Sequence, residues 1–251
     1  MIELPEQLRR LPANQLEELL LATDAGLWAE RRRGFVNAGF QLEWYALAKT
    51  EKRLAVVAPR DHSKTEIFTV NCTAHPVIYR PGLWTYVFAA SGDLAAELKT
   101  RIDSAVAEAR PDLVDGARVR TRNETVYANG SRVTVAGVGK SVRGAHPDRI
   151  VGDDVLTDES TLTEYQRAKT HKWWAGTIGG MSHPGTTRLI RGLGRVHFPA
   201  TQVVLVGTPF HAQDLLMSMR SNRVYHFRRY AAEFDPTKLV PGTYAVEVAR
   251  G

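Results

Sequence analysis

Four short apolar runs, separated by segments with helical spacing, constrain the fold of this chain more than any other feature. The runs are LAVVA (54–58), LWTYVFAA (83–90), RIVGDD (149–154) and TQVVLVG (201–207). Strands that are apolar throughout are buried on both faces, and the helices between them supply the covering layers. The pattern predicts an α/β fold whose mostly parallel sheet is flanked by helices. Because ligands of such sheets bind at the carboxyl ends of strands, the residues that follow each run are candidates for a binding site.

The other segments complete this prediction. The spacing of apolar residues predicts a helical N-terminal segment over residues 1–50, ahead of a core over residues 51–251. A further helix is predicted over residues 94–109. The dipeptide Asn129-Gly130 between two β-rich stretches predicts a hairpin. Residues 176–194, rich in glycine and arginine, predict a long mobile loop.

Composition excludes several classes of protein. The 33 Lys and Arg residues against 27 Asp and Glu give a net charge of +6, which is compatible with a polyanionic partner but too small to indicate one. The single cysteine, Cys72, cannot form an internal disulfide, and no apolar run approaches the ~20 residues that span a bilayer. The first residues do not resemble a secretory signal. We therefore expect a cytoplasmic protein without a membrane partner, and the spacing of the eight histidines predicts no zinc site.

The segment APRDHSKT, which follows the first run, has the spacing of a phosphate-binding P-loop. Ala58 and Ser63 occupy the two positions usually held by glycine, whereas Lys64 and Thr65 match the pattern. In such a loop the backbone N–H groups wrap the β-phosphate, the lysine reaches the β- and γ-phosphates, and the hydroxyl binds Mg²⁺. The alternative is a plain turn between a strand and a helix. The candidate nucleotide-binding residues are Ala58, Pro59, Arg60, Asp61, His62, Ser63, Lys64 and Thr65.

Two later runs add to this signal. RIVGDD is an apolar strand that ends in two carboxylates, the form of a Walker B motif, in which one acid binds Mg²⁺ and the next orients or deprotonates water. Its alternative is a helix cap in a surface turn. The run that ends in Gly207 and Thr208 places a hydroxyl at the same edge of the sheet. Together, the P-loop and the acid pair predict an enzyme that hydrolyses ATP.

The order PRDHSKT, YVFAASGDLAAELKTRI, GKSVRGAHPDRIVGDD, GTPFHAQDLL resembles the ATPase domain of large terminases, the DNA-packaging motors of tailed bacteriophages. The block from SVRG through the acid pair is the most specific part. The resemblance implies a RecA-like (ASCE-type) P-loop NTPase that uses ATP and Mg²⁺ to move double-stranded DNA into a procapsid. It also implies a portal protein, a small terminase subunit and further copies in a ring as partners, in the cytoplasm of an infected bacterial host.

The resemblance also implies roles for single residues. Lys64 and Thr65 correspond to the phosphate and Mg²⁺ ligands, and Asp153 to the carboxylate on the metal side. Asp154 stands where many of these motors have glutamate, so the base is either Asp154, which we favour, or Glu159, with Asp158 behind it. Thr208 corresponds to the residue that couples the nucleotide state to the motor.

Arginines and aromatic residues supply the remaining candidates. Arg143 corresponds to an arginine finger that reaches the ATP of a neighbouring subunit, and Arg60 is a candidate for a similar role in cis; the alternative for each is a surface ion pair. Gln41 precedes the P-loop at a distance suited to an adenine contact. For Phe40 and Trp44 we favour core packing over stacking on the base. Two basic rows are candidates for DNA phosphates, with a solvated surface as the alternative: Arg118, Arg120 and Arg122, and Arg188, Arg191 and Arg195.

Large terminases usually carry a nuclease domain after the ATPase domain, and the chain ends at Gly251 without room for one. We therefore expect no nuclease activity from it. A superfamily 2 helicase would need a second RecA-like domain, for which the chain is too short. The other alternative is a non-hydrolysing DNA-binding or scaffold module, which Ala58 and Ser63 favour and the intact Lys64, Thr65 and Asp153 oppose.

Overall fold

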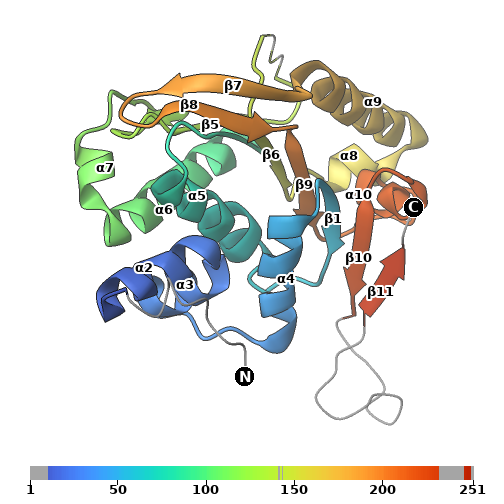
Figure 1. The fold of residues 1–251 in the computed structure, drawn as a ribbon. Helices are drawn as coiled ribbons and strands as arrows, with labels where there is room; N and C mark the ends of the chain where they lie inside the picture. Colours follow the sequence, from blue (N-terminus) through green and yellow to red (C-terminus); the bar gives the residue numbers. More distant parts are fainter. Residues whose placement is uncertain (1–10, 141, 143, 232–245, 250–251) are drawn as a thin grey trace.

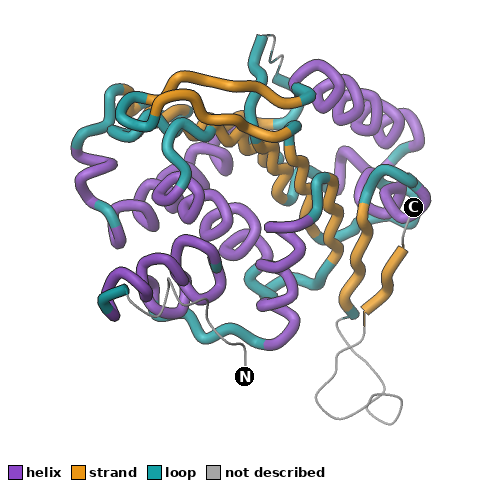
Figure 2. Tube along the Cα trace, viewed as in Figure 1, coloured by secondary structure: helices purple, strands orange, loops and turns teal. Residues whose placement is uncertain are grey.

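The computed structural model describes residues 11–140, 142, 144–231 and 246–249 (Figure 1). Within them, helices cover both sides of a central sheet, as Figure 2 shows. No helix in these ranges is long and apolar enough to cross a membrane. The α/β class predicted from the apolar runs is confirmed.

In its described part, from residue 11 on, the N-terminal segment forms three helices: α2 (Ala13–Thr23), α3 (Ala25–Arg33) and α4 (Gly39–Thr50). The carboxylate of Asp24 accepts a hydrogen bond from the N–H of Leu27 and thereby caps the first turn of α3. Gly34 ends α3 in the left-handed conformation, with φ of 70°. The predicted helical segment is confirmed over α2–α4, whereas its first ten residues lie outside the described part of the chain.

Nine of the described strands form one sheet in the order β11-β10-β1-β9-β6-β2-β5-β4-β3. Neighbouring strands from β10 to β5 are parallel, and the outer pairs are antiparallel. One strand, β9, therefore lies between β1 and β6, which lead into the predicted P-loop and the acid pair. The strands are β1 (Arg53–Val57), β2 (Trp84–Ala89), β3 (Val119–Arg120), β4 (Glu124–Val126), β5 (Arg132–Gly137), β6 (Arg149–Asp153), β9 (Gln202–Gly207), β10 (His226–Tyr230) and β11 (Val246–Ala249).

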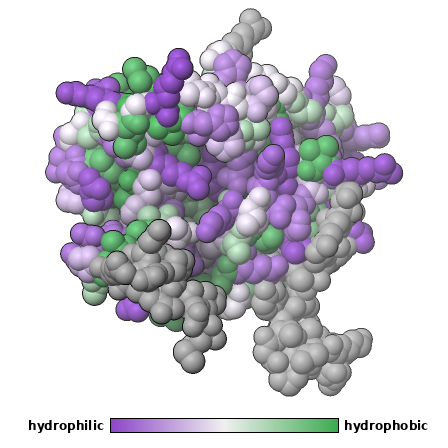
Figure 3. Space-filling view, in the orientation of Figure 1, coloured by the Kyte–Doolittle hydropathy of each residue, from purple (hydrophilic) through white to green (hydrophobic). Residues whose placement is uncertain are grey.

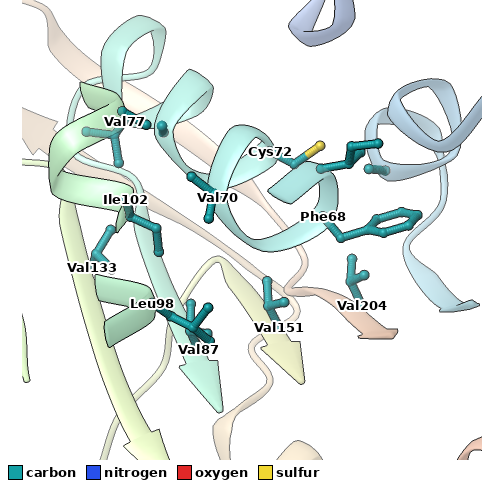
Figure 4. Packing of buried hydrophobic residues seen from close by; sticks show 14 of the residues in the cluster. Phe68, Val70, Cys72, Val77, Val87, Leu98, Ile102, Val133, Val151 and Val204 are labelled. Carbon is teal, nitrogen blue, oxygen red and sulfur yellow. The ribbon is translucent and has the colours of Figure 1, made fainter. Parts of the chain in front are cut away.

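Two hydrophobic clusters pack on the two faces of the sheet. The first joins the N-terminal helices to η1 (Thr65–Asn71), α5 (Cys72–Tyr79), α6 (Gly92–Ala109) and α7 (Pro111–Asp115); Figure 4 shows Phe68, Val70 and Ile102 of these helices facing the strands. The second lies under α9 (Glu164–Met181) and α10 (Leu215–Ser218). In β1, Leu54 and Val56 enter the first cluster while Ala55 and Val57 enter the second, because successive side chains of a strand point to opposite faces.

The predicted hairpin at Asn129-Gly130 is confirmed, since β4 and β5 pair antiparallel across it. The predicted mobile loop over residues 176–194 is wrong. Its first part continues α9 to Met181, and the rest forms a two-stranded sheet with β7 (Gly185–Ile190) and β8 (Gly194–Pro199). Gly192 and Gly194 have φ of 82° and 75°, so these glycines make the turn of a hairpin that was expected to be irregular.

A buried aspartate attaches this β7–β8 hairpin to the amino end of the sheet. Asp148, which precedes β6, accepts hydrogen bonds from the N–H of Trp84 at 2.8 Å and from the guanidinium of Arg188, and pairs with His183 Nε2 at 3.2 Å. The guanidinium of Arg188 also stacks on the ring of Phe198, 3.7 Å from its centroid. The hairpin is thus fixed by a fully bonded carboxylate at the edge opposite to the P-loop.

The remaining short helices are α8 (Asp158–Leu162) and η2 (Met219–Ser221). α8 follows the acid pair directly and is capped by Thr157, whose hydroxyl accepts from the N–H of Ser160. η1 begins at the P-loop threonine and has π-helical hydrogen bonding, with the N–H of Cys72 donating to the carbonyl of Ile67. Such wide turns occur frequently at functional sites.

Candidate nucleotide-binding site

A cavity of about 770 Å³ lies at the carboxyl ends of β1, β6 and β9, where the sequence predicted a binding site. It is walled by the loop after β1, the start of α6, the segment after the acid pair and the loop after β9. Its lining residues are Arg60, Asp61, Ser63, Lys64, Thr65, Glu66, Ala90, Leu94, Arg101, Asp154, Leu156, Thr157, Asp158, Thr208 and Phe210. Four segments far apart in the sequence therefore meet at one concave surface.

The backbone around this cavity is strained. Among the described residues, the non-glycine residues with positive φ are Asp61 at 62°, Ser63 at 63° and Asp154 at 41°, and all three line the cavity. An L-residue with a Cβ atom in this conformation costs of the order of 1–3 kcal/mol. Ser63 stands where a P-loop usually has glycine, and it adopts the backbone conformation that glycine adopts at no cost. The loop has thus kept its shape although the residue changed.

Lys64 is buried at the base of the cavity, with 5% of its surface exposed. Its Nζ donates to the carbonyl of Pro59 at 2.5 Å, inside the same loop. Burial lowers the pKa of Lys64, and the carboxylates of Asp154 and Asp153 partly offset that shift. A buried ammonium beside acidic groups is held close to where a phosphate would enter.

Thr65 and Asp153 come together from the P-loop and from the end of β6. The hydroxyl of Thr65 donates to Oδ1 of Asp153 at 3.1 Å. Asp153 Oδ2 is buried without a well-formed hydrogen bond from a described residue, although the Thr69 hydroxyl lies close enough to lower the pKa of this carboxyl. Burial, and after it the neighbouring charge of Asp154, raises the pKa of Asp153 to about 7. A hydroxyl and an unsatisfied buried carboxylate fit Mg²⁺, a hard cation that takes oxygen ligands and completes its shell with water and phosphate.

Asp154 forms hydrogen bonds with the end of β9, the strand next to β6. Its N–H donates to the carbonyl of Val206, and its Oδ1 accepts from the N–H of Thr208 at 3.1 Å. The hydroxyl of Thr208 in turn donates to the carbonyl of Ala58 at 3.3 Å. Gly207 permits this approach, because a Cβ atom there would lie 2.8 Å from Oδ1 of Asp154. Thr208 therefore links the predicted base to the first residue of the P-loop.

The structure separates the other candidates for catalysis. Asp158 lines the cavity, whereas Glu159 is exposed on α8 and is not among the cavity residues. Arg60 lines the cavity, with its guanidinium carbon 6.0 Å from the centroid of the Phe210 ring. Arg143 lies outside the described residues, so its role as a finger stays a prediction.

Gln41 contacts the P-loop rather than the cavity. Its Nε2 donates to the carbonyl of His62 at 3.4 Å, and its Oε1 accepts from the N–H of Ala38 at 2.9 Å. The ring of His62 lies 5.9 Å from that of Phe40, and Trp44 is fully buried in the first cluster. α4 thus supports the P-loop from behind, at the position where the sequence suggested an adenine contact.

Sequence reasoning missed several cavity residues. Glu66 follows Thr65 directly, so its position was visible in the sequence although its charge argues against a phosphate site. Arg101 reaches the cavity from the middle of α6, and Phe210 from the loop after β9. Phe210 is held there because its N–H donates to the buried carboxylate of Asp214 at 2.8 Å. No local pattern marks Arg101, because only the packing of α6 against η1 brings it there.

The two basic rows differ in what they contact. Arg122 pairs with Asp93, and Arg120 lies 3.7 Å from Asp103. Arg188 is held by Asp148, as described above. Arg118, Arg191 and Arg195 are exposed and form no ion pair with a described residue. The face in Figure 3 is mostly hydrophilic, with hydrophobic residues scattered over it.

No known family profile matches the chain, and no curated protein matches it. Solved structures that are similar to it include two of a phage terminase domain. The ATPase domain of the Thermus phage P74-26 large terminase is 17% identical, with a TM-score of 0.45, over 80% of this chain and 71% of that one. A mutant of the same domain is 15% identical, with a TM-score of 0.44, over 79% of this chain and 70% of that one.

Proposed function

We propose that this chain is the ATP-hydrolysing motor domain of a viral terminase large subunit. The observation that carries the proposal is the convergence of Lys64, Thr65, Asp153, Asp154 and Thr208 on one site from the ends of β1, β6 and β9. Each residue has the chemistry that phosphoryl transfer requires at its place. The sequence blocks that resemble large terminases add the DNA-packaging context.

Binding begins at the P-loop. The ammonium of Lys64 leaves the carbonyl of Pro59 and takes phosphate oxygens, a stronger partner because both groups are charged. Thr65 and Asp153 are the residues that would hold Mg²⁺, which neutralises charge on the phosphates when it is bound. The raised pKa of Asp153 means that it gives up a proton when it becomes a metal ligand near neutral pH.

Asp154 is the base that the geometry favours over Glu159. Its Oδ1 is fixed by the N–H of Thr208, which leaves Oδ2 to accept a proton from the attacking water. The water oxygen forms a bond to the γ-phosphorus, the bond from that phosphorus to the bridging oxygen breaks, and the proton passes to Asp154. ADP and phosphate leave, and the proton returns to solvent.

The same contact supplies a route for coupling. Loss of the γ-phosphate changes what surrounds Asp154, and Thr208 joins Asp154 to both β9 and the end of β1. In the proposed motor, the resulting shift of the strand ends moves double-stranded DNA. The DNA is threaded through a ring of copies on the portal protein of a procapsid. The small terminase subunit delivers the DNA, and the site of action is the cytoplasm of the infected host cell.

The test is Mg²⁺-dependent release of phosphate from ATP, measured on the wild-type chain and on Lys64→Ala, with and without DNA. The proposal expects turnover that disappears in the variant and in excess chelator. Arg110→Ala, a change to an exposed arginine that pairs with Asp112 outside the cavity, is the control and should hydrolyse ATP like the wild type.

The second candidate is a non-hydrolysing module that binds DNA or acts as a scaffold. Ala58 and Ser63 in place of glycine, and the strain at Ser63, favour it. It predicts no phosphate release at any protein concentration, even with DNA and portal present. Mg²⁺-dependent turnover that is lost in Lys64→Ala would exclude it.

A further inference from the structure

Glu66 places a negative charge beside the predicted phosphate site, and two arginines neutralise it. Its Oε1 pairs with Arg33 NH1 and its Oε2 with Arg101 NH2, each at 2.5 Å. Glu66 follows Thr65 and lines the cavity, with 17% of its side chain exposed. An uncompensated carboxylate at this place would repel a polyphosphate, so the two guanidinium groups matter for binding.

The two arginines differ in how firmly they are held. Arg33 is 11% exposed and also binds Glu108 at 2.8 Å and the side-chain oxygen of Asn71. Burial acts against its charge, but the hydrogen bonds to Glu108 and Glu66 prevail and raise the pKa of Arg33. Arg33 is therefore a fixed counter-charge that joins α3 to η1 and α6.

Arg101 is held by Glu66 alone among the described residues. Its side chain is 40% exposed, and it lines the cavity together with Lys64, Thr65 and Asp154. Because the arginine end of this ion pair is open to solvent, we expect the pair to contribute less to stability than the buried pair of Glu66 with Arg33. Arg101 can thus leave Glu66 while Arg33 continues to neutralise it.

The order of strands shows which part of a nucleotide Arg101 would meet. α6 follows β2, and β2 pairs with β6 on the side away from β9 and β1. Arg101 therefore approaches the P-loop from the side of the acid pair, where the metal and the terminal phosphate would lie.

We propose that Arg101 binds the terminal phosphate of a nucleoside triphosphate, exchanging its contact with Glu66 for a phosphate oxygen. The inference rests on the proposed function, since it assigns a further ligand to the same site. A planar guanidinium suits this role because it can give two parallel hydrogen bonds to a phosphate. The residue acts in cis, on the nucleotide of its own chain.

The test compares the binding of a non-hydrolysable ATP analogue with that of ADP, both with Mg²⁺. The variants are Arg101→Ala, Arg101→Lys and, as the matched control, Arg110→Ala. Arg110 follows the end of α6, is 49% exposed and pairs with one carboxylate, that of Asp112, outside the cavity. Thermal melts of each variant verify that it folds.

We expect Arg101→Ala to weaken binding of the triphosphate analogue about tenfold, the loss of a hydrogen bond between charged groups, and to change ADP binding less than twofold. Arg101→Lys keeps the charge and should recover part of the loss. Arg110→Ala should bind both nucleotides like the wild type. Glu66→Gln, which releases Arg101, should bind the triphosphate analogue at least as tightly as the wild type.

Two results overturn the inference alone: equal affinity of Arg101→Ala and wild type for the triphosphate analogue, or an equal loss for the analogue and for ADP. The second result would show that Arg101 only supports the fold of the loop. A wild-type chain that binds neither nucleotide overturns the proposed function, and the inference with it.

Discussion

Two buried aspartates at opposite ends of one strand show how differently the two edges of the sheet are built. Asp148 precedes β6, and its carboxylate is bonded to a backbone N–H, a histidine and an arginine. Asp153 ends β6, and its Oδ2 is buried without a well-formed hydrogen bond from any described residue. The first carboxylate is complete, whereas the second keeps its binding capacity for something that the chain does not supply.

The backbone repeats this contrast. At the carboxyl edge, three non-glycine residues with positive φ surround the cavity. At the amino edge, the residues with positive φ in the β7–β8 turn are glycines, which adopt this conformation without strain. The amino edge also holds buried side-chain atoms without a partner among the described residues, Nε of Arg188 and Nε of Arg149, so the contrast rests on the two carboxylates and on the strained backbone. Strain on three residues around an unpartnered carboxylate oxygen indicates that the carboxyl edge is shaped for a ligand.

The largest effect is expected at the carboxyl edge, in catalysis. Asp154→Asn removes the proton acceptor while it can keep the hydrogen bond from the N–H of Thr208, so kcat for ATP hydrolysis should fall roughly 10³-fold. Glu159→Gln, a change on the exposed face of α8, should alter kcat less than twofold. The measurement is steady-state phosphate release at saturating ATP. Equal losses in the two variants would refute the choice of Asp154 as base.

The next effect is on stability and compares the two aspartates directly. Asp148→Asn weakens the ion pair with Arg188 and the contact with His183, and we expect it to lower the free energy of unfolding by about 3 kcal/mol. Asp153→Asn removes a buried charge whose desolvation and repulsion by Asp154 outweigh the attraction of Lys64, so it should leave the metal-free chain as stable or more stable.

Denaturant unfolding of both variants in chelator at pH 8 makes this comparison. If Asp153→Asn loses as much stability as Asp148→Asn, the two edges are not built differently, and the contrast fails. In a second measurement, Mg²⁺ with nucleotide should stabilise the wild type but not Asp153→Asn, because only the wild type retains the carboxylate that binds the metal.

The parts that the sequence predicted are those encoded by local patterns. Apolar runs gave the parallel strands, and their last residues gave Lys64, Thr65, Asp153 and Asp154, because a strand end fixes where the next residues lie. Residues 176–194 misled because glycine and arginine are common both in loops and in tight hairpins. The alternation of TTRLI and RVHF around Gly192 was the signal for strands.

Other parts could not be predicted from local patterns. Arg101 lies thirty-five positions beyond Glu66 in the chain, and only the packing of α6 on η1 joins them. The positive φ of Ser63 could not be predicted either, because serine usually adopts a negative φ. A local sequence pattern predicts neither the distant contacts of a long side chain nor the strain of the backbone.

A third prediction concerns acid and separates the cavity from the packing of the N-terminal helices. Burial lowers the pKa of His75 to about 4, although its Nε2 lies 2.8 Å from the carbonyl of Leu21. The unfolded chain takes up the proton first, so stability should fall as the pH falls from about 6.5 towards 4. The loss should amount to roughly 3 kcal/mol by pH 4.

His75→Gln keeps a hydrogen-bond donor and does not titrate. The difference in unfolding free energy between wild type and His75→Gln, measured from pH 8 to pH 4, isolates this group from the carboxylates of the cavity. We expect the difference to change in favour of the variant as the pH falls. A difference that does not vary with pH would show that His75 is protonated as readily in the folded chain as in the unfolded one.

The smallest effect tests the strain itself. Ser63→Gly removes the Cβ atom that makes a φ of 63° unfavourable, but it also makes the unfolded chain more flexible, so the free energy of unfolding should rise by only about 0.5 kcal/mol. Ser104→Gly, at an exposed position in the middle of α6, has no strain to relieve and should lose about 0.5 kcal/mol. Denaturant midpoints at constant slope measure both changes.

Opposite signs would show that Ser63 adopts a backbone conformation in the P-loop that is unfavourable for serine. Equal losses would show instead that contacts of the Ser63 side chain stabilise the loop, and the contrast between the two edges would then rest on the two aspartates alone.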